Sequence, residues 1–127
     1  MAPSDSCTTF EQLKREILAF ADERDWGQFH TLKNLSVALA GEAAELMEPF
    51  QWLEGQQSFD LMDDEAKREA VEDELADVLI YALQFANQGK IDVASAIRRK
   101  MGKNARKYPV HASKGNSVKR GVDREDV

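Results

Sequence analysis

Carboxylate side chains recur at helical spacing in two stretches of this 127-residue sequence. Glu42 and Glu45 lie three residues apart in GEAAEL, and Glu74 and Asp77 lie three residues apart in DELADV. Residues at i and i+3 share one face of an α-helix. Glu42 also falls inside an apolar stripe of helical period, where a carboxylate is costly unless its charge is compensated. These four carboxylates are therefore candidates for binding a positively charged group.

If the two predicted helices pack antiparallel, the four carboxylates meet at one interface. Like charges raise one another's pKa, so all four stay ionised only if a cation lies among them. Ligands that are all hard oxygen atoms suit Mg²⁺ or Mn²⁺ rather than zinc or copper. Mg²⁺ held by few carboxylates keeps waters and takes phosphate oxygens as further ligands. The two pairs thus predict a magnesium site that binds a phosphate compound.

The same spacing also occurs on helix faces that only contact solvent. We interpret the remaining acids of these stretches in that way: Glu48, Glu65, Glu69, Glu72 and Asp73. The apolar residues beside Glu42 and Glu74 favour a ligand set for the two pairs instead. A di-iron carboxylate bundle is disfavoured, because it needs Glu-x-x-His on two helices and neither His30 nor His111 follows a glutamate by three residues.

Basic residues gather near the C-terminal end of the last predicted helix, although the chain has a formal net charge of −6. They are Arg98, Arg99, Lys100, Lys103, Arg106 and Lys107. A basic helix C-terminus that interacts with its own dipole explains part of this cluster. Lys100, Asn104 and Tyr108 share one face at i, i+4 and i+8, where lysine and asparagine can hold phosphate oxygens.

Two tryptophans, Trp26 and Trp52, flank the first acidic stretch. Core packing explains either one alone, but two beside an acidic cluster also suit a flat base held by stacking. His30 lies near Trp26 without a second histidine close in sequence, so we expect a hydrogen-bond donor rather than a metal ligand.

The hydrophobic pattern predicts four helices and no strand, which is an all-α fold. The predicted helices run from Phe10 to between Asp22 and Asp25, from Leu32 or Asn34 to Leu53, from Glu65 to Gln88, and from Asp92 to Lys107. The expected N-caps are Thr8 or Thr9 with a capping box to Glu11 or Gln12, Asp63 or Asp64, and Asp92.

Glycine and proline mark the second helix and the segment after it. Gly41, inside the helix, lowers its stability, which close approach of another helix would offset. Pro49 is expected to kink the last turn and Gly55 to end the helix. The following stretch, GQQSFDLMDD, is expected to be a loop.

The third predicted helix contains LADVLIYALQFA, which is apolar on nearly every side. Such a helix is buried on more than one face, so in a chain this small it predicts an oligomer interface. Residues 1–111 are predicted to form one domain. Residues 112–127 are polar and poor in aromatic residues, which predicts a disordered tail.

The composition excludes several classes of protein. The acidic net charge disfavours binding to duplex nucleic acid. The single cysteine, Cys7, excludes an internal disulfide framework and a cysteine-built zinc site. No 18-residue apolar run predicts a membrane span, and MAPSDSC lacks the features of a secretory signal. A soluble, cytoplasmic protein is expected.

Three segments occur in order along residues 10 to 111: RDWGQFHTLKNLSVALAGEAAELMEPFQW, DELADVLIYALQFAN and KMGKNARKYP. Together they resemble the all-α nucleoside triphosphate pyrophosphohydrolases of the MazG-like superfamily, and within it the dCTP pyrophosphatase group. The sequence departs from the usual pattern in having GEAAE in place of GEVGE and a short loop at residues 55–64.

The resemblance implies a four-helix fold assembled into a homotetramer, a dimer of dimers. It implies hydrolysis of a deoxynucleoside triphosphate, dCTP or a modified dCTP, to the monophosphate and pyrophosphate, with Mg²⁺ as cofactor and Mn²⁺ as a possible substitute.

The resemblance also assigns site residues. It assigns metal binding to Glu42, Glu45, Glu74 and Asp77, and we expect Glu45 to orient or deprotonate the attacking water. It assigns contact with the base to Trp26, His30 and Trp52. It assigns contact with the sugar or phosphates to Asn34, Tyr81, Lys100, Asn104 and Tyr108.

Two alternatives stay open at this point. One is a pyrophosphohydrolase that prefers dUTP or accepts many nucleoside triphosphates. The other is a helical interaction module without catalytic activity, in which the apolar third helix builds an oligomer and the basic fourth helix binds a partner.

Overall fold

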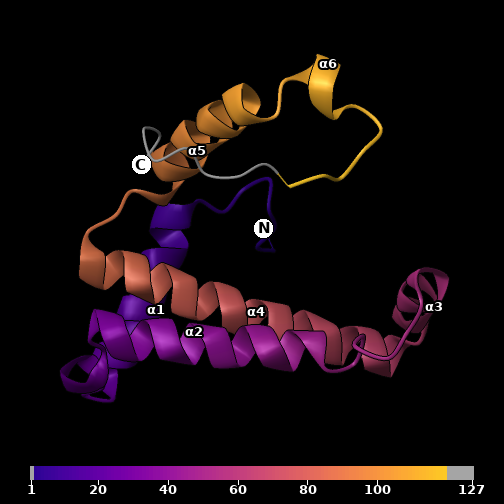
Figure 1. Ribbon diagram of the computed structural model, residues 1–127. Helices are drawn as coiled ribbons and strands as arrows, with labels where there is room; N and C mark the ends of the chain where they lie inside the picture. The colour runs from indigo at the N-terminus through magenta and orange to yellow at the C-terminus, as the bar shows by residue number, and fades with distance from the viewer. Residues whose placement is uncertain (1, 120–127) are drawn as a thin grey trace. The chain divides into compact units, whose positions relative to one another are not determined.

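A computed structural model describes residues 2–119, and Figure 1 shows the arrangement of its helices. They are α1 (Phe10–Glu23), the 3₁₀ turn η1 (Gly27–Phe29), α2 (Leu32–Met47), α3 (Gly55–Asp60), the 3₁₀ turn η2 (Leu61–Asp63), α4 (Glu65–Gly89), α5 (Val93–Lys107) and α6 (Val110–Ser113). Residues 2–119 contain no strand, so the all-α prediction is confirmed. None of the described helices is long and apolar enough to cross a membrane.

The chain divides into two compact units, Met1–Ile91 and Asp92–Val127. The first contains α1 to α4, and the second contains α5 and α6. In the second unit, α6 extends to Ser113 and so places the first two residues of the predicted tail in a helical turn. Residues 120–127 of that predicted tail lie outside the described residues.

The first unit is organised around α2 and α4, which lie side by side and antiparallel (Figure 1). Leu35 of α2 is 1% exposed, and Val71 and Leu83 of α4 are buried with it. α1 packs on α4 as well and contributes the buried Ala21. The core is thus a seam of aliphatic side chains along α4, which fixes the positions of the polar residues beside it.

The predicted helix starts are confirmed in atomic detail. Thr9 and Gln12 form the capping box of α1, in which the Gln12 amide donates to Thr9 Oγ1 at 3.1 Å and the Thr9 amide donates to Gln12 Oε1 at 2.7 Å. Asp64 Oδ1 accepts from the Lys67 amide at 3.0 Å, and Asp92 Oδ1 accepts from the Ser95 amide at 2.9 Å. These side chains satisfy amide groups that have no partner inside their helices.

The predicted end of the second helix was wrong. α2 ends at Met47 rather than Leu53, because Pro49 has no N–H to donate and its ring clashes with the preceding helical turn. Gly55 does not end a helix but begins α3, whose capping box pairs Glu54 with Gln57. Residues 55–64, expected as a loop, therefore contain α3 and η2.

Gly41 also differs from the expectation. A Cβ atom built on Gly41 would meet no other atom within 4 Å, so no helix of the described chain approaches it closely.

Replacing the most buried core leucine should strongly destabilise this unit. We expect Leu35→Ala to lower the free energy of unfolding by about 2–5 kcal/mol, because it leaves a cavity between α2 and α4. Urea denaturation at fixed protein concentration measures the loss. Leu53→Ala is the matched control, since Leu53 is 36% exposed and lies outside the helices, and it should cost clearly less. Equal losses would contradict the core assignment.

Candidate metal centre

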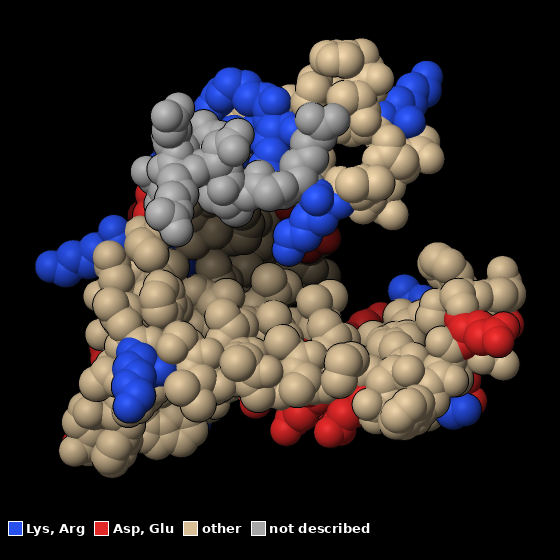
Figure 2. Space-filling view, viewed as in Figure 1, with Lys and Arg blue, Asp and Glu red and all other residues tan. Residues whose placement is uncertain are grey.

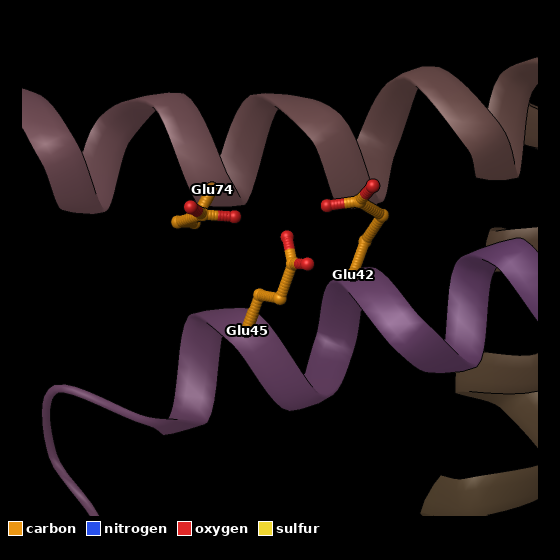
Figure 3. A group of neighbouring side chains, drawn as sticks. All are labelled: Glu42, Glu45 and Glu74. Atoms are coloured by element: carbon orange, nitrogen blue, oxygen red, sulfur yellow. The ribbon is translucent and has the colours of Figure 1, made fainter.

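Three glutamates of α2 and α4 meet at the helix interface, as Figure 3 shows. Glu42, Glu45 and Glu74 each offer a carboxylate oxygen, and these three atoms all lie within 4.8 Å of one another. Glu42 and Glu45 come from successive turns of α2, and Glu74 points toward them from α4. The antiparallel packing of α2 and α4 is therefore what brings three of the four predicted carboxylates together.

This cluster contains carboxylate oxygens that no protein group satisfies. Glu42 Oε2 and Glu74 Oε2 are shielded from solvent and have no hydrogen-bond partner in the described chain. Oxygens of this kind are costly to bury and are normally paired or bound to a metal. Glu45 is the exposed member of the three, whereas Glu42 and Glu74 are half-buried.

The electrostatics of the cluster follow from this crowding. A hydrogen bond with the Glu45 carboxyl raises the pKa of Glu42 above its ordinary value of 4.5, and burial and the charges of Glu45, Asp77 and Glu74 raise it further. Burial is the largest cause of the raised pKa of Glu74, followed by the charge of Glu45. Glu42 and Glu74 thus resist ionisation when no cation lies beside them.

The donor set fits a hard divalent cation. It consists of carboxylate oxygens alone, without histidine or cysteine, and two of its oxygens lack any other partner. Such ligands match Mg²⁺ or Mn²⁺ better than softer metals.

Asp77, the fourth predicted ligand, lies outside the group of three. Its charge contributes to the raised pKa of both Glu42 and Glu74, so it belongs to the same electrostatic environment. Its side chain lines a neighbouring cavity. Metal binding by Asp77 stays a prediction.

A cleft of about 500 Å³ lies beside the glutamates, and two of its residues were missed in the sequence. Glu48, interpreted there as only solvent-facing, lines this cleft with Glu45 and Glu74, and its charge helps raise the pKa of Glu74. Lys67 adds a positive charge to the same cleft. Helical spacing would have indicated both, since Glu48 follows Glu45 by three residues and Lys67 precedes Glu74 by seven.

A second cavity, of about 250 Å³, lies between α1, α4 and the segment before α2. It brings together Trp26, His30 and Tyr81, three of the predicted substrate-binding residues, with Asp77 on its wall. Its other lining residues are Ile17, Phe20, Ala21, Ile80 and Gln84. The Trp26 and His30 rings meet edge to face with their centroids 6.4 Å apart. This aromatic cavity is small enough to suit a single heterocycle rather than a whole nucleotide.

Two predicted substrate residues of the first unit lie elsewhere. Trp52 is 86% exposed and follows the C-terminal end of α2, whereas Trp26 precedes its N-terminal end. Since a 16-residue helix is about 24 Å long, one chain does not bring the two tryptophans to one base. Asn34 uses its side-chain amide to donate to the Phe29 carbonyl at 2.9 Å, which fixes η1 against the start of α2.

The last three predicted residues belong to the second unit. Lys100 and Asn104 share a face of α5, whereas Tyr108 is the C-cap residue with φ −120° and ψ 66° and so leaves the helix. Figure 2 shows lysine and arginine side chains gathered over α5, as the sequence predicted. The roles of these three residues in substrate binding stay predictions.

Comparison with known proteins identifies the family of this chain. A MazG-like family model matches residues 37–121. The dCTP pyrophosphatase 1 of Bos taurus is 41% identical over 111 residues, which cover 87% of this chain and 66% of the relative. The corresponding Homo sapiens protein is 40% identical over 111 residues and is covered to 65%. A pyrophosphatase of known structure from Archaeoglobus fulgidus has 38% identity and a TM-score of 0.75, with coverage of 85% of this chain and 99% of that chain.

The chain therefore belongs to the MazG-like family. It spans slightly less than two thirds of the length of the mammalian relatives, 66% and 65% in the two cases given.

Removing one charge from the cluster should stabilise the metal-free protein. Because the pKa values of Glu42 and Glu74 are raised in the folded state, the folded chain binds protons more tightly than the unfolded chain does. Stability therefore falls as the pH rises above 4.5, their ordinary pKa. We expect Glu42→Gln to raise the Tm in EDTA at pH 8, with a smaller gain at pH 5.

The same substitution should reduce the rise in Tm that Mg²⁺ causes in the unsubstituted protein. Thermal unfolding with EDTA or Mg²⁺ measures both effects, and Glu69→Gln, on exposed α4 surface, is the control that should change neither. A lower Tm for Glu42→Gln in EDTA at pH 8 would show that the carboxylates do not repel one another as described.

Proposed function

We propose that this chain is a Mg²⁺-dependent nucleoside triphosphate pyrophosphohydrolase that converts dCTP, or a modified dCTP, to the monophosphate and pyrophosphate. The observation that carries the proposal is the group of three glutamates with two buried, unsatisfied oxygens. The aromatic cavity that shares Asp77 with their environment supports a nucleotide as ligand. The choice of dCTP rests on the named mammalian relatives.

The glutamates divide their roles by exposure. When bound, Mg²⁺ supplies charge neutralisation for the phosphates and lowers the pKa of a bound water. Glu42, Glu74 and Asp77 hold the metal. Glu45 also orients the attacking water and accepts its proton, because it is the most exposed of the three glutamates.

The two cavities bind different parts of the substrate in this proposal. The cleft beside the glutamates takes the phosphates, where Lys67 adds a positive charge. The aromatic cavity takes the base against Trp26 and His30, and Tyr81 lies on its wall toward the sugar. Asn34, Lys100, Asn104 and Tyr108 complete the contacts with sugar and phosphates in this proposal.

The proposal includes assembly into a homotetramer, a dimer of dimers. Leu79 and Leu75 of α4 are 50% and 47% exposed, and Val37 of α2 is 63% exposed. Figure 2 shows few charged side chains across the middle of the α2 and α4 face turned to the viewer. Exposed apolar surface of this kind supports an interface between copies. In such an assembly Trp52 serves the base site of a neighbouring protomer, because it lies too far from Trp26 in its own chain.

A reducing compartment such as the cytoplasm fits this role. Cys7 is the single cysteine and is free, so the chain has no internal disulfide that an oxidising compartment would form.

The test of the enzymatic proposal is pyrophosphate release from dCTP. We expect turnover that EDTA abolishes and Mg²⁺ restores, and a loss of roughly 10²–10⁴-fold in kcat for Glu45→Gln because the proton acceptor is removed. Glu69→Gln should retain activity. Parallel assays with dUTP, dTTP, dATP and dGTP measure the base preference.

The possible results distinguish the alternatives. Higher kcat/KM for dUTP, or similar values for all substrates, would overturn the dCTP assignment and keep the reaction class. Absence of pyrophosphate release from every triphosphate, with no Mg²⁺ binding, would overturn the enzymatic proposal in favour of a helical interaction module.

The assembly is tested separately by sedimentation equilibrium. We expect a mass of about four chains and, for Leu79→Lys, dissociation to smaller species at micromolar concentration, because a buried unpaired ammonium is strongly disfavoured at an interface. Gln56→Lys makes the same charge change on α3 and should leave the mass unaltered. A monomeric unsubstituted protein would contradict the proposed interface.

A further inference from the structure

Gln84 is the buried polar side chain in the core of the described chain. It is 2% exposed, and it lies on α4 at the wall of the aromatic cavity. Both ends of its amide are engaged: Nε2 lies 3.0 Å from His30 Nδ1, and Oε1 accepts from Asn87 Nδ2 at 3.0 Å. A buried amide destabilises the fold unless its nitrogen and its oxygen both have hydrogen-bond partners. In Gln84 each of the two atoms has one partner.

The orientation of this chain of hydrogen bonds is determined at its far end. Asn87 Nδ2 also donates to the Lys14 carbonyl of α1 at 2.9 Å, and a backbone carbonyl can only accept. The atom of Asn87 at that position must therefore be the amide nitrogen. Its second hydrogen points to Gln84, so the facing atom of Gln84 must be its oxygen.

The orientation of the Gln84 amide determines which nitrogen of His30 carries the proton. With Oε1 directed at Asn87, the amide nitrogen of Gln84 is the atom that faces His30 Nδ1, and it donates. Nδ1 must then carry a lone pair, which places the proton of the neutral ring on Nε2. Nε2 makes no hydrogen bond within residues 2–119, and His30 lines the aromatic cavity with Trp26.

We infer that Gln84 is a positioning residue that holds His30 as an Nε2–H donor, and that this donor selects a base with a hydrogen-bond acceptor at the facing position. The choice of base rests on the proposed function. Cytosine has an unprotonated N3 that accepts from Nε2–H, whereas uracil presents N3–H, which would meet another donor. Base discrimination thus depends on a relay from the Lys14 carbonyl through Asn87 and Gln84 to His30.

Two substitutions of Gln84 test whether this relay fixes the tautomer of His30. In Gln84→Glu, a carboxylate still accepts from Asn87 Nδ2 but can only accept from His30. Nδ1 must then be protonated, and the neutral ring presents Nε2 as an acceptor. Gln84→Met keeps a similar shape and supplies neither donor nor acceptor, so it releases the ring without reversing it.

The first experiment is ¹⁵N NMR of the histidine rings in the full chain without nucleotide, at alkaline pH. His111, exposed on α6, is the other histidine and provides an internal reference for an unconstrained ring. We expect His30 to be protonated at Nε2 in the unsubstituted protein and at Nδ1 in Gln84→Glu. In Gln84→Met we expect His30 to have the same mixture of the two neutral tautomers as His111.

Since a free imidazole already favours Nε2–H, the Gln84→Glu protein is the decisive case. Protonation of Nδ1 there, in a neutral or a doubly protonated ring, supports the relay. An unprotonated Nδ1 in that protein, or a protonated Nδ1 in the unsubstituted protein, overturns it. If Gln84→Glu does not fold, the loss of a fixed tautomer in Gln84→Met supports the relay, and an unchanged His30 overturns it.

The second experiment compares kcat/KM for dCTP and dUTP. At a pH where NMR shows a neutral His30 ring, we expect Gln84→Glu to lower the ratio of kcat/KM for dCTP to that for dUTP roughly tenfold or more, mainly through KM. The reason is that two acceptors, His30 Nε2 and cytosine N3, then face each other in place of one buried hydrogen bond. An unchanged preference with a reversed tautomer would overturn the role in base selection. If the unsubstituted protein hydrolyses no triphosphate, the proposed function fails, while the NMR result still decides the relay independently.

Discussion

The packing of α2 against α4 is the constraint on which the rest of the site depends. Aliphatic side chains such as Leu35 and Val71 drive the two helices together, and the same contact forces Glu42, Glu45 and Glu74 into a space that suits neither their charge nor their hydrogen bonding. The apolar seam therefore holds the carboxylates where a cation is most strongly attracted. Without a cation, the repulsion and burial of these carboxylates reduce the stability of the fold. Binding of a cation removes this cost, so metal binding stabilises the folded state.

One face of α4 connects the metal ligands to the base cavity. Glu74, Asp77, Tyr81 and Gln84 follow one another at intervals of three or four residues, so their side chains form a continuous strip along the helix. Asp77 is the link in this strip, because its charge acts on the glutamates while its side chain lines the aromatic cavity. The length of α4 between Glu74 and Gln84 thus sets the distance between the glutamates and the aromatic cavity.

Local patterns predicted the long helices and the N-caps of α1, α4 and α5, because a capping residue is visible within a few residues of sequence. The same patterns failed where two local effects competed: Pro49 ended α2 early, and the capping box of Glu54 and Gln57 turned an expected loop into α3. The contact between Gln84 and His30 joins residues 54 positions apart, and no local period indicates it. The two tryptophans, which their shared chemistry suggested as a pair, are kept apart within one chain by the length of α2, and their contact with one base stays a prediction.

Gly41 has a consequence for motion in the site. It lies in the interior of α2 directly before Glu42, with open space where a side chain would be. Glycine costs a helix interior about 1 kcal/mol relative to alanine, and nothing within the described chain packs against it to offset this. Local opening of a helix is easiest where its intrinsic stability is lowest. Gly41 therefore lowers the local stability of α2 in the turn that carries two of the glutamates, and a shift of the backbone there would change the spacing of the carboxylates while the core around Leu35 stays fixed.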